Sequence, residues 1–283
     1  MDISPDGQTL AFAMDDSLMF WNLVTLKSTG SISTKLHGKI FSIDYSGRGD
    51  KIAAGGSDSS VVIVDLSNQN SILRFKGAQG VITSVKFSPD DTFLAAGCSD
   101  HCIYIWQMDN TEKVIKLEGH QKDVTDIEFL NNNYLAGCDG EGKILIWNLI
   151  KKQVESNLTA HKGWARDLSL NHDNQQLVSC GDDALVKNWK IGKHYFPELV
   201  SSEKLGLDWL NCIDLYGSDF IGSISLNRKV YVDTKNGLYT YKTNAFAYKI
   251  LFIPETIPFK IIYCTLDDGI FLLEAENMNL KQH

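Results

Sequence analysis

The sequence predicts an all-β fold built from seven similar sheets, and three observations support this prediction. First, a bulky apolar residue recurs near the end of a short apolar run, at steps of 41 to 43 residues. Second, each period contains several alternating apolar runs separated by Ser-Pro, Asp-Asp and Gly turn signals. Third, steps this uniform indicate a repeat architecture. The recurring residues are Trp21, Val64, Trp106, Trp147, Trp189, Val232 and Leu273.

The third unit shows how each element is predicted. Residues 81–106, VITSVKFSPDDTFLAAGCSDHCIYIW, predict a strand, a turn, a second strand, a tight acidic turn and a third strand. Residues 111–120, TEKVIKLEGH, add a fourth strand. Four antiparallel strands per unit form one blade, and seven blades make a β-propeller. We therefore expect one domain over residues 1–283, with blades ending near residues 22, 65, 107, 148, 190, 233 and 274.

The two ends of the chain need separate treatment. MDISPDG, residues 1–7, enters the first blade late in its innermost strand, so we expect blade 1 to be incomplete. At the other end, only NMNLKQH, residues 277–283, is left to complete blade 7. How the ring closes, and whether this chain is a piece of a longer protein, stay open at this point.

The repeat resembles the WD-repeat (WD40) β-propeller family over essentially the whole chain. Gly119-His120, the FSPD at 87–90 and the acidic turn before Trp106 match the family pattern. No literal Trp-Asp dipeptide occurs, and blades 6 and 7 depart furthest from the pattern. The residues that replace the aspartate of that dipeptide are Asn22, Gln107, Asn148 and Lys190. The resemblance implies a seven-bladed propeller of four-stranded antiparallel blades that acts in protein interactions.

Composition narrows the classes of function. The net charge of -8 and the sequence pI of about 5.3 disfavour binding to a phosphate backbone, so we expect no direct nucleic-acid partner. Residues 248–266 are broken by prolines and charges, so we expect no membrane span. No P-loop or dinucleotide-binding glycine motif occurs, and we expect no cofactor.

Six cysteines lie mostly inside apolar runs, where a reduced thiol is a small core residue. This pattern, together with an N-terminus that does not look like a signal peptide, predicts an intracellular protein, cytoplasmic or nuclear, and not a secreted one. Cys98, His101 and Cys102 could be read as metal ligands. No second Cys/His pair stands at a matching spacing, so we interpret them as core thiols and a turn histidine, and we expect no metal.

The fifth unit places a histidine, a serine and an aspartate close together, as a hydrolase triad would. In the WD-repeat family the corresponding positions form a structural tetrad with a tryptophan. Here the four residues are His161, Ser179, Asp183 and Trp189. Ser179 falls in the middle of a predicted strand and no G-x-S-x-G elbow surrounds it, so we favour the structural interpretation and expect no enzyme.

The same alignment shows that unit 5 alone has all four members. Unit 4 keeps His120 and Trp147, with Gly137 at the serine position and Glu141 at the acidic one. Units 1 to 3 have alanine where unit 5 has serine.

Partner-binding residues are expected where the chain enters each innermost strand, on the narrow top rim of a propeller. Blades 5 to 7 put aromatic and arginine side chains there, and these residue types dominate binding hot spots. The alternative is that Trp209 and Phe246 pack between blades. The predicted partner-binding residues are Lys39, Phe41, Asp123, Trp164, Arg166, Trp209, Asn211, Phe246 and Tyr248.

These observations predict a non-catalytic scaffold, a monomeric propeller within a multiprotein complex. We hypothesise that it grips an acidic peptide segment through Arg166 and Lys39. An alternative is an assembly factor for ribonucleoproteins, because residues 138–168 and 181–190 are similar to two repeats of a small-subunit processome WD protein. A ubiquitin-ligase adaptor is disfavoured because the family's adaptor arginine is missing. The corresponding positions hold Val24, Asp109, Ile150 and Gly192.

Overall fold

The protein is described by a computed structural model covering residues 1–68, 71–171, 175–192, 195–206, 208–217, 220–234, 237–253, 260–265, 269–274 and 279–281. The described residues form β-strands joined by turns, and no α-helix occurs among them. The strands are arranged in seven sheets, and neighbouring strands within them pair antiparallel among the described residues. These sheets are the blades of a seven-bladed β-propeller, the fold class that the sequence predicts.

The chain divides into two compact units, Met1–Asp139 with Leu145–Val154, and Gly140–Ile144 with Glu155–His283. The first unit contains three complete blades. Blade 1 consists of β1 (Asp2–Ile3), β2 (Thr9–Met14), β3 (Ser17–Asn22) and β4 (Lys27–Ser33). Blade 2 consists of β5 (Ile40–Tyr45), β6 (Lys51–Gly56), β7 (Val61–Asp65) and β8 (Ile72–Phe75). Blade 3 consists of β9 (Ile82–Phe87), β10 (Phe93–Cys98), β11 (Cys102–Gln107) and β12 (Asn110–Glu118).

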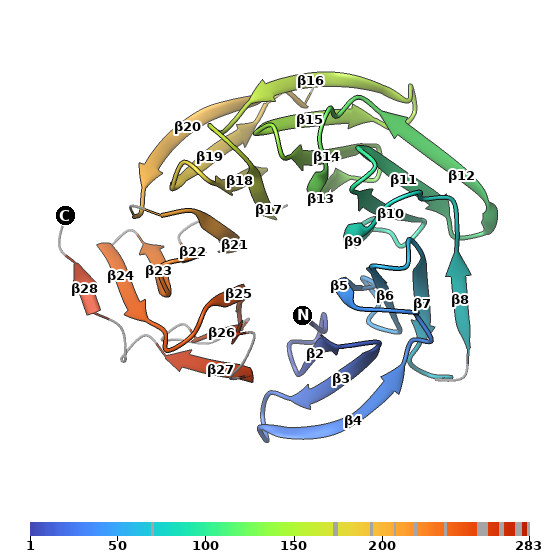
Figure 1. Ribbon diagram of the computed structural model, residues 1–283, viewed down its shortest axis with the longest axis horizontal. Coiled ribbons are helices and arrows are strands. Elements are labelled where there is room, and N and C mark those ends of the chain that lie inside the picture. The colour runs from blue at the N-terminus through green and yellow to red at the C-terminus, as the bar shows by residue number, and fades with distance from the viewer. Residues whose placement is uncertain are drawn as a thin grey trace. The chain divides into compact units, whose positions relative to one another are not determined.

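Blade 4 holds residues of both units, and blades 5 to 7 belong to the second (Figure 1). Blade 4 consists of β13 (Val124–Asn131), β14 (Tyr134–Asp139), β15 (Lys143–Asn148) and β16 (Gln153–Thr159). Blade 5 consists of β17 (Ala165–Asn171), β18 (Gln176–Gly181), β19 (Leu185–Ile191) and β20 (Pro197–Lys204). Blade 6 contains β21 (Leu210–Tyr216), β22 (Phe220–Ser225), β23 (Lys229–Thr234), β24 (Gly237–Lys242) and β28 (Asn279–Lys281). Blade 7 contains β25 (Ala247–Phe252), β26 (Lys260–Thr265) and β27 (Gly269–Glu274).

The two ends of the chain compare differently with the prediction. The chain enters blade 1 late in its innermost strand, as expected: β1 has only two residues, which pair with Leu10 and Ala11 of β2 in a sheet of four strands. The C-terminal strand β28 does not complete blade 7. It pairs antiparallel with β24, with Leu238 opposite Lys281, and so becomes the fifth strand of blade 6. The prediction for the C-terminal segment was wrong because the outer edge of β24 was also available, and an unpaired edge accepts any nearby extended segment.

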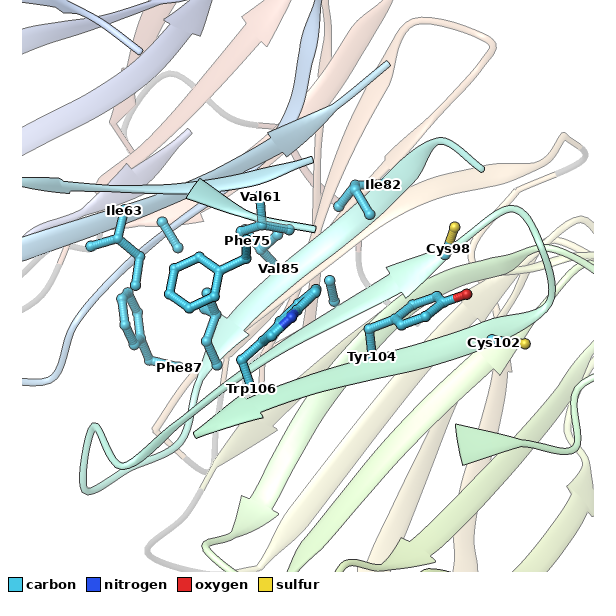
Figure 2. Close-up of a cluster of buried hydrophobic side chains, with 13 residues drawn as sticks. Val61, Ile63, Phe75, Ile82, Val85, Phe87, Cys98, Cys102, Tyr104 and Trp106 are labelled. Carbon is cyan, nitrogen blue, oxygen red and sulfur yellow. The ribbon is translucent and has the colours of Figure 1, made fainter. Parts of the chain in front are cut away.

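Burial explains why the third strand of a blade is apolar along its whole length. Strand β11, with sequence CIYIWQ, is buried from Cys102 to Trp106, because its two faces pack against the neighbouring blades rather than against water. Figure 2 shows one of these interfaces, where Trp106 and Tyr104 of β11 meet side chains of blade 2 such as Val61, Ile63 and Phe75. Trp106 lies 5.6 Å from Phe75 between ring centroids.

Candidate functional site

A β-bulge positions the rim residue at the start of most inner strands. In β17 the register with β18 shifts between Ala165 and Asp167, so Arg166 is the extra residue of the bulge. Asn211 of β21 and Tyr248 of β25 occupy the same position, as Phe41 does in β5. A bulge re-aims the side chain that it inserts. This is the physical reason why the residue after the first apolar position of the inner strand faces the rim.

The sequence-predicted rim residues are mostly exposed. Five of them are large hydrophobic side chains with exposed fractions of 39 to 56%. These five are Phe41, Trp164, Trp209, Phe246 and Tyr248. Asn211 and Asp123 are half-buried, and Lys39 is exposed. Lys39, Phe41 and Asp123 belong to the first compact unit, and the other six belong to the second.

Four side chains of the second unit make up what we call the arginine cluster: Trp164, Arg166, Asp182 and Trp209. The guanidinium carbon of Arg166 lies 4.8 Å from the ring centroid of Trp164 and 5.4 Å from that of Trp209. Its Nε donates to Oδ1 of Asp182 at 2.6 Å. The orientation of the arginine is therefore set by cation–π contacts with two indoles and by a charged hydrogen bond.

The loop before β17 is shaped to make this cluster. Gly163 has a φ of +92°, and a Cβ at this position would lie 3.0 Å from the Cβ of Asp182. The backbone N–H of Trp164 points to Oδ2 of Asp182 at 3.4 Å. Ser57 and Ser99 hold the corresponding loops of blades 2 and 3 by accepting from a backbone N–H at 2.9 Å. In blade 5, Asp182 holds the loop through the N–H of Trp164, and it also forms the ion pair with Arg166.

A second arginine lies on the rim in the same unit. Arg228, in the turn between β22 and β23, has its guanidinium carbon 4.9 Å from the ring centroid of Phe246. Its Nη1 donates to the carbonyl oxygen of Asn244 at 3.4 Å. The inner strands β17, β21 and β25 follow one another from blade 5 to blade 7 (Figure 1). Two arginine–aromatic contacts therefore occur at successive blade junctions.

Carboxylates on the inner strands tie consecutive blades together directly below the rim. Asp167, next to Arg166, accepts from the backbone N–H of Ile213 at 2.9 Å and faces Nζ of Lys249 at 3.2 Å. Asp214 accepts from the N–H of Phe252 at 2.7 Å. Because Asp167 contacts blades 6 and 7 from blade 5, it fixes the backbone from which Arg166 projects.

The first unit repeats this arrangement. Asp2 accepts from the N–H of Tyr45 and Asp44 from the N–H of Phe87, both at 2.7 Å. Lys86 lies 3.7 Å from Asp44 and 2.7 Å from Glu128. Burial raises the pKa of Asp44 well above its usual range, and the charges of Asp2 and Glu128 add to this effect against that of Lys86. The charged side chains of Asp44, Lys86 and Glu128 link neighbouring blades.

The four residues that resemble a triad with a tryptophan form one chain of hydrogen bonds. His161 is hydrogen-bonded through Nδ1 to Oδ1 of Asp183 at 2.8 Å and through Nε2 to Oγ of Ser179 at 2.8 Å. The indole N–H of Trp189 donates to the same Oγ at 3.0 Å. Ser179 is 0% exposed. A nucleophile at this position cannot meet a substrate, so the geometry favours the structural interpretation over the hydrolase.

Asp183 also holds the rim loop, since its Oδ2 accepts from the backbone N–H of Lys162 at 3.0 Å. Burial acts to raise its pKa, but the hydrogen bonds from His161, Lys162 and Leu185 and the charge of His161 outweigh it, so the pKa lies below the usual value. The two adjacent acids of one turn therefore have different tasks. Asp183 anchors the loop to the tetrad, and Asp182 positions Arg166.

In blade 4 the acid that contacts the histidine is not the one that the alignment indicates. Nδ1 of His120 is 2.7 Å from Oδ2 of Asp139, two residues before Glu141, and both side chains are 0% exposed. Glu141 instead pairs with Lys143 at 2.7 Å. Because Gly137 has no hydroxyl, Nε2 of His120 and Nε1 of Trp147 are buried without a hydrogen-bond partner among the described residues.

The remaining candidate sites are two clefts and the residues considered as metal ligands. Two clefts of about 350 and 370 Å³ lie in the first unit, at the turns between first and second strands. They are lined by corresponding residues of successive blades, including Tyr45 in one and Phe87 in the other. Among the described residues, no group of three or more His, Cys, Asp or Glu side chains is placed to hold a metal ion. His101 faces Asp123 at 3.4 Å.

Comparison with known proteins assigns the family. Residues 30–65, 69–107, 111–148 and 152–190, together more than half of the chain, match the family model of the WD domain, G-beta repeat. The chain belongs to the WD-repeat family. The matched residues run from within β4 of blade 1 to within β19 of blade 5, and they include the tetrad of blade 5.

Several known proteins are similar to this chain over a shorter stretch. DDB1- and CUL4-associated factor 13 of Dictyostelium discoideum is 39% identical over 76 residues, which are 27% of this chain and 16% of that protein. The protein of the same name from Xenopus tropicalis is 33% identical over 88 residues, or 30% of this chain and 19% of that protein. The human one is 34% identical over 56 residues, or 20% of this chain and 12% of that protein. The matches thus span less than a fifth of these relatives.

The sequence interpretation missed three acids, Asp139, Asp167 and Asp182, and the rim arginine Arg228. The sequence GDD at 181–183 contains two adjacent acids, and the tetrad needs only one of them. The second acid was therefore a signal that Asp182 has a role of its own. Asp167 lies close to the register of Asp44 and Asp214, which alternate with apolar residues on inner strands.

None of the described segments forms a helix long and apolar enough to cross a membrane.

Proposed function

We propose that this WD-repeat chain is a non-catalytic scaffold within a multiprotein complex, and that it binds a partner's peptide segment on the rim of blades 5 to 7. The observation that carries the proposal is the arginine cluster. Trp164 and Trp209 stay 39% and 47% exposed although each packs against Arg166. Exposed aromatic groups that are held rigid cost little further entropy when a partner covers them.

Family membership supports the proposal. WD-repeat propellers present loops around a rigid set of blades, and loops on a rigid scaffold commonly carry binding residues. The buried Ser179 supports a protein without hydrolase activity, and the cysteines, five of the six buried, support an intracellular location. The proposed scaffold needs no cofactor, binds neither nucleic acid nor membrane directly and is a monomer within its complex.

The names of the relatives suggest one kind of complex. DDB1- and CUL4-associated factor 13 is named for association with DDB1 and CUL4, and a corresponding adaptor role is a candidate for this chain. The exposed Val24 and Ile150 stand where an adaptor arginine is expected, which is the observation against it. The second candidate is the assembly of ribonucleoproteins, and co-sedimentation with pre-ribosomal particles tests it.

Quantitative pull-downs from the source cell test the scaffold role. Trp164→Ala with Arg166→Glu removes most of the cluster, and Phe196→Ala removes a side chain that is 52% exposed but lies outside the rim. All three proteins should have equal melting temperatures. We expect the double variant to lose one coherent set of partners that the wild type and Phe196→Ala retain. Equal capture by all three proteins would refute the rim as the binding surface.

A further inference from the structure

The contacts of Arg166 leave one part of its side chain available. The guanidinium makes cation–π contacts with Trp164 and Trp209, and Nε is bound to Asp182. Among the described residues, nothing is hydrogen-bonded to the two terminal amino groups, Nη1 and Nη2. The side chain is 24% exposed. The free edge of the guanidinium thus presents donors in one plane, already fixed in orientation.

Two coplanar N–H donors match the two oxygens of a carboxylate. A partner cation would have to displace Arg166, which already occupies the space next to the indoles and has Asp182 as its counter-ion. A phosphate group also offers two oxygens to these donors, so a phosphorylated residue is the alternative ligand that the experiment has to distinguish. The cluster therefore favours an anionic side chain, and we take an Asp or Glu side chain as the ligand.

The indoles add a requirement for the neighbours of that acid. Side chains at positions i and i+2 of an extended segment point to the same face and lie about 7 Å apart. An acid that meets the free edge of Arg166 would place residues two positions before and after it beside Trp164 and Trp209. Both indoles have exposed apolar surface, so apolar residues at those positions lose contact with water on binding.

The charge along the rim fits the same partner. Arg228 lies at the next blade junction against Phe246, and among the described residues it has no ion-pair partner. The inner carboxylate Asp167 is 8% exposed and faces Lys249, so it contributes little negative charge to the surface. An acidic segment that runs from blade 5 toward blade 7 meets a second cation.

Resting on the proposed function, we propose that the arginine cluster recognises an extended peptide of the form apolar–any–acid–any–apolar, with the carboxylate bound by the terminal amino groups of Arg166. Asp182 is a positioning residue in this site, because it holds the guanidinium beside the indoles and does not itself touch the partner.

Defined peptides test the proposal. The probes are Ser-Gly-Leu-Ala-Glu-Ala-Phe-Gly-Ser and three matched peptides with Gln, Lys or phosphoserine in place of Glu. Binding is followed by NMR through the indole N–H signals of Trp164 and Trp209, which are assigned with Trp→Phe variants. We expect the Glu peptide to bind about tenfold more tightly than the Gln peptide, as a charged hydrogen bond implies. In Arg166→Gln this preference should vanish while the Gln peptide binds as before.

Each other result overturns a distinct part of the argument. A Glu preference that survives in Arg166→Gln, or tightest binding by the Lys or phosphoserine peptide, refutes recognition of a carboxylate while leaving the rim as a binding surface. If no peptide shifts the signals of Trp164 or Trp209, the proposed peptide form is refuted, and the pull-downs decide separately whether the rim is a binding surface. Should Arg166→Gln fold poorly, Arg166→Lys keeps the charge without the planar fork, and it is expected to lose most of the preference.

Discussion

Blades 4 and 5 solve the same packing problem with different polar groups. Each buries a histidine from the loop before its inner strand and a tryptophan from its third strand. In blade 5 the hydroxyl of Ser179 joins His161 to Trp189. In blade 4 the residue between His120 and Trp147 is Gly137, and the ring centroids of that pair are 6.3 Å apart. Within the described residues, their inner nitrogens have no partner.

The difference shows which contacts hold the loop and which serve the tryptophan. An acid on the outer histidine nitrogen is present in both blades, supplied by Asp139 in one and by Asp183 in the other. The serine bridge is present only in blade 5. Blade 3 uses a third solution, since the indole N–H of Trp106 donates to the carbonyl of Lys76 at 3.3 Å. The histidine–acid pair is therefore common to the two blades, and the tryptophan contact is variable.

The largest effect is expected from removing the acid of blade 4. Asp139→Ala leaves His120 buried with both ring nitrogens unpartnered, and breaking a buried pair in this way costs about 3 kcal/mol of unfolding free energy. Glu141→Ala is the matched control, because Glu141 is 46% exposed and its pair with Lys143 adds little. Urea unfolding measures both. If Glu141→Ala were the more destabilising variant, the acid suggested by the sequence alignment would be the correct one.

The corresponding change in blade 5 should cost somewhat less. Asp183→Ala removes the acceptor of His161, Lys162 and Leu185, and we expect a loss of about 1–3 kcal/mol. Asp183 is 10% exposed, so water can replace part of these contacts. The thermal midpoint measures the loss. An unchanged midpoint would contradict a bracing role for this acid.

The same residue gives a dependence on pH with a definite sign. The pKa of Asp183 is lower in the folded protein than in the unfolded chain, so its contribution to stability is present above the unfolded value, about 3.9. The contribution is lost as the pH falls through the lower, folded value. The stability difference between the wild type and Asp183→Asn should therefore be constant near neutral pH and shrink below about pH 4. A difference that grows on acidification would show the opposite shift.

A serine in blade 4 tests the comparison in the other direction. In Gly137→Ser the new Cβ would lie 2.8 Å from Cδ1 of Ile103, the flexible end of that side chain, and 3.0 Å from Nε2 of His120. Gly137→Ala creates the same steric contact without a hydroxyl. We expect the serine variant to be about 1 kcal/mol more stable than the alanine variant, because its hydroxyl can bond His120 and Trp147. Equal midpoints would mean that the hydroxyl does not reach them.

Much of the fold could be predicted from the sequence because the repeat is local. The positions of Trp21, Trp106, Trp147 and Trp189 fix where third strands lie, and turn residues between alternating apolar runs fix the other strands. The pairing of β28 with β24 could not be predicted. It depends on which strand edge a C-terminal segment meets in space, and periodicity does not specify that choice.

The candidate site was predictable only in part, for a similar reason. The repeat register gives the rim positions, and the β-bulges in the inner strands explain their exposure. The partner of Arg166 was missed because Asp182 comes from a different turn, 16 residues along the chain. Asp139 was missed because its side chain reaches His120 from two residues before the aligned position. Sequence alignment assigns a role to a position, whereas a side chain can reach the same partner from a neighbouring one.

The smallest effect on stability is expected at Asp182, the neighbour of Asp183. Asp182→Asn breaks an ion pair whose side chains are 24% and 13% exposed, and partly exposed pairs of this kind contribute about 0.5 kcal/mol. The thermal midpoint should hardly change, while the Nε–H of Arg166 loses its charged acceptor and exchanges faster with water in NMR spectra. This contrast separates the acid that braces the fold from the acid that positions the site. A loss of stability as large as that of Asp183→Ala would instead make both acids part of one structural brace.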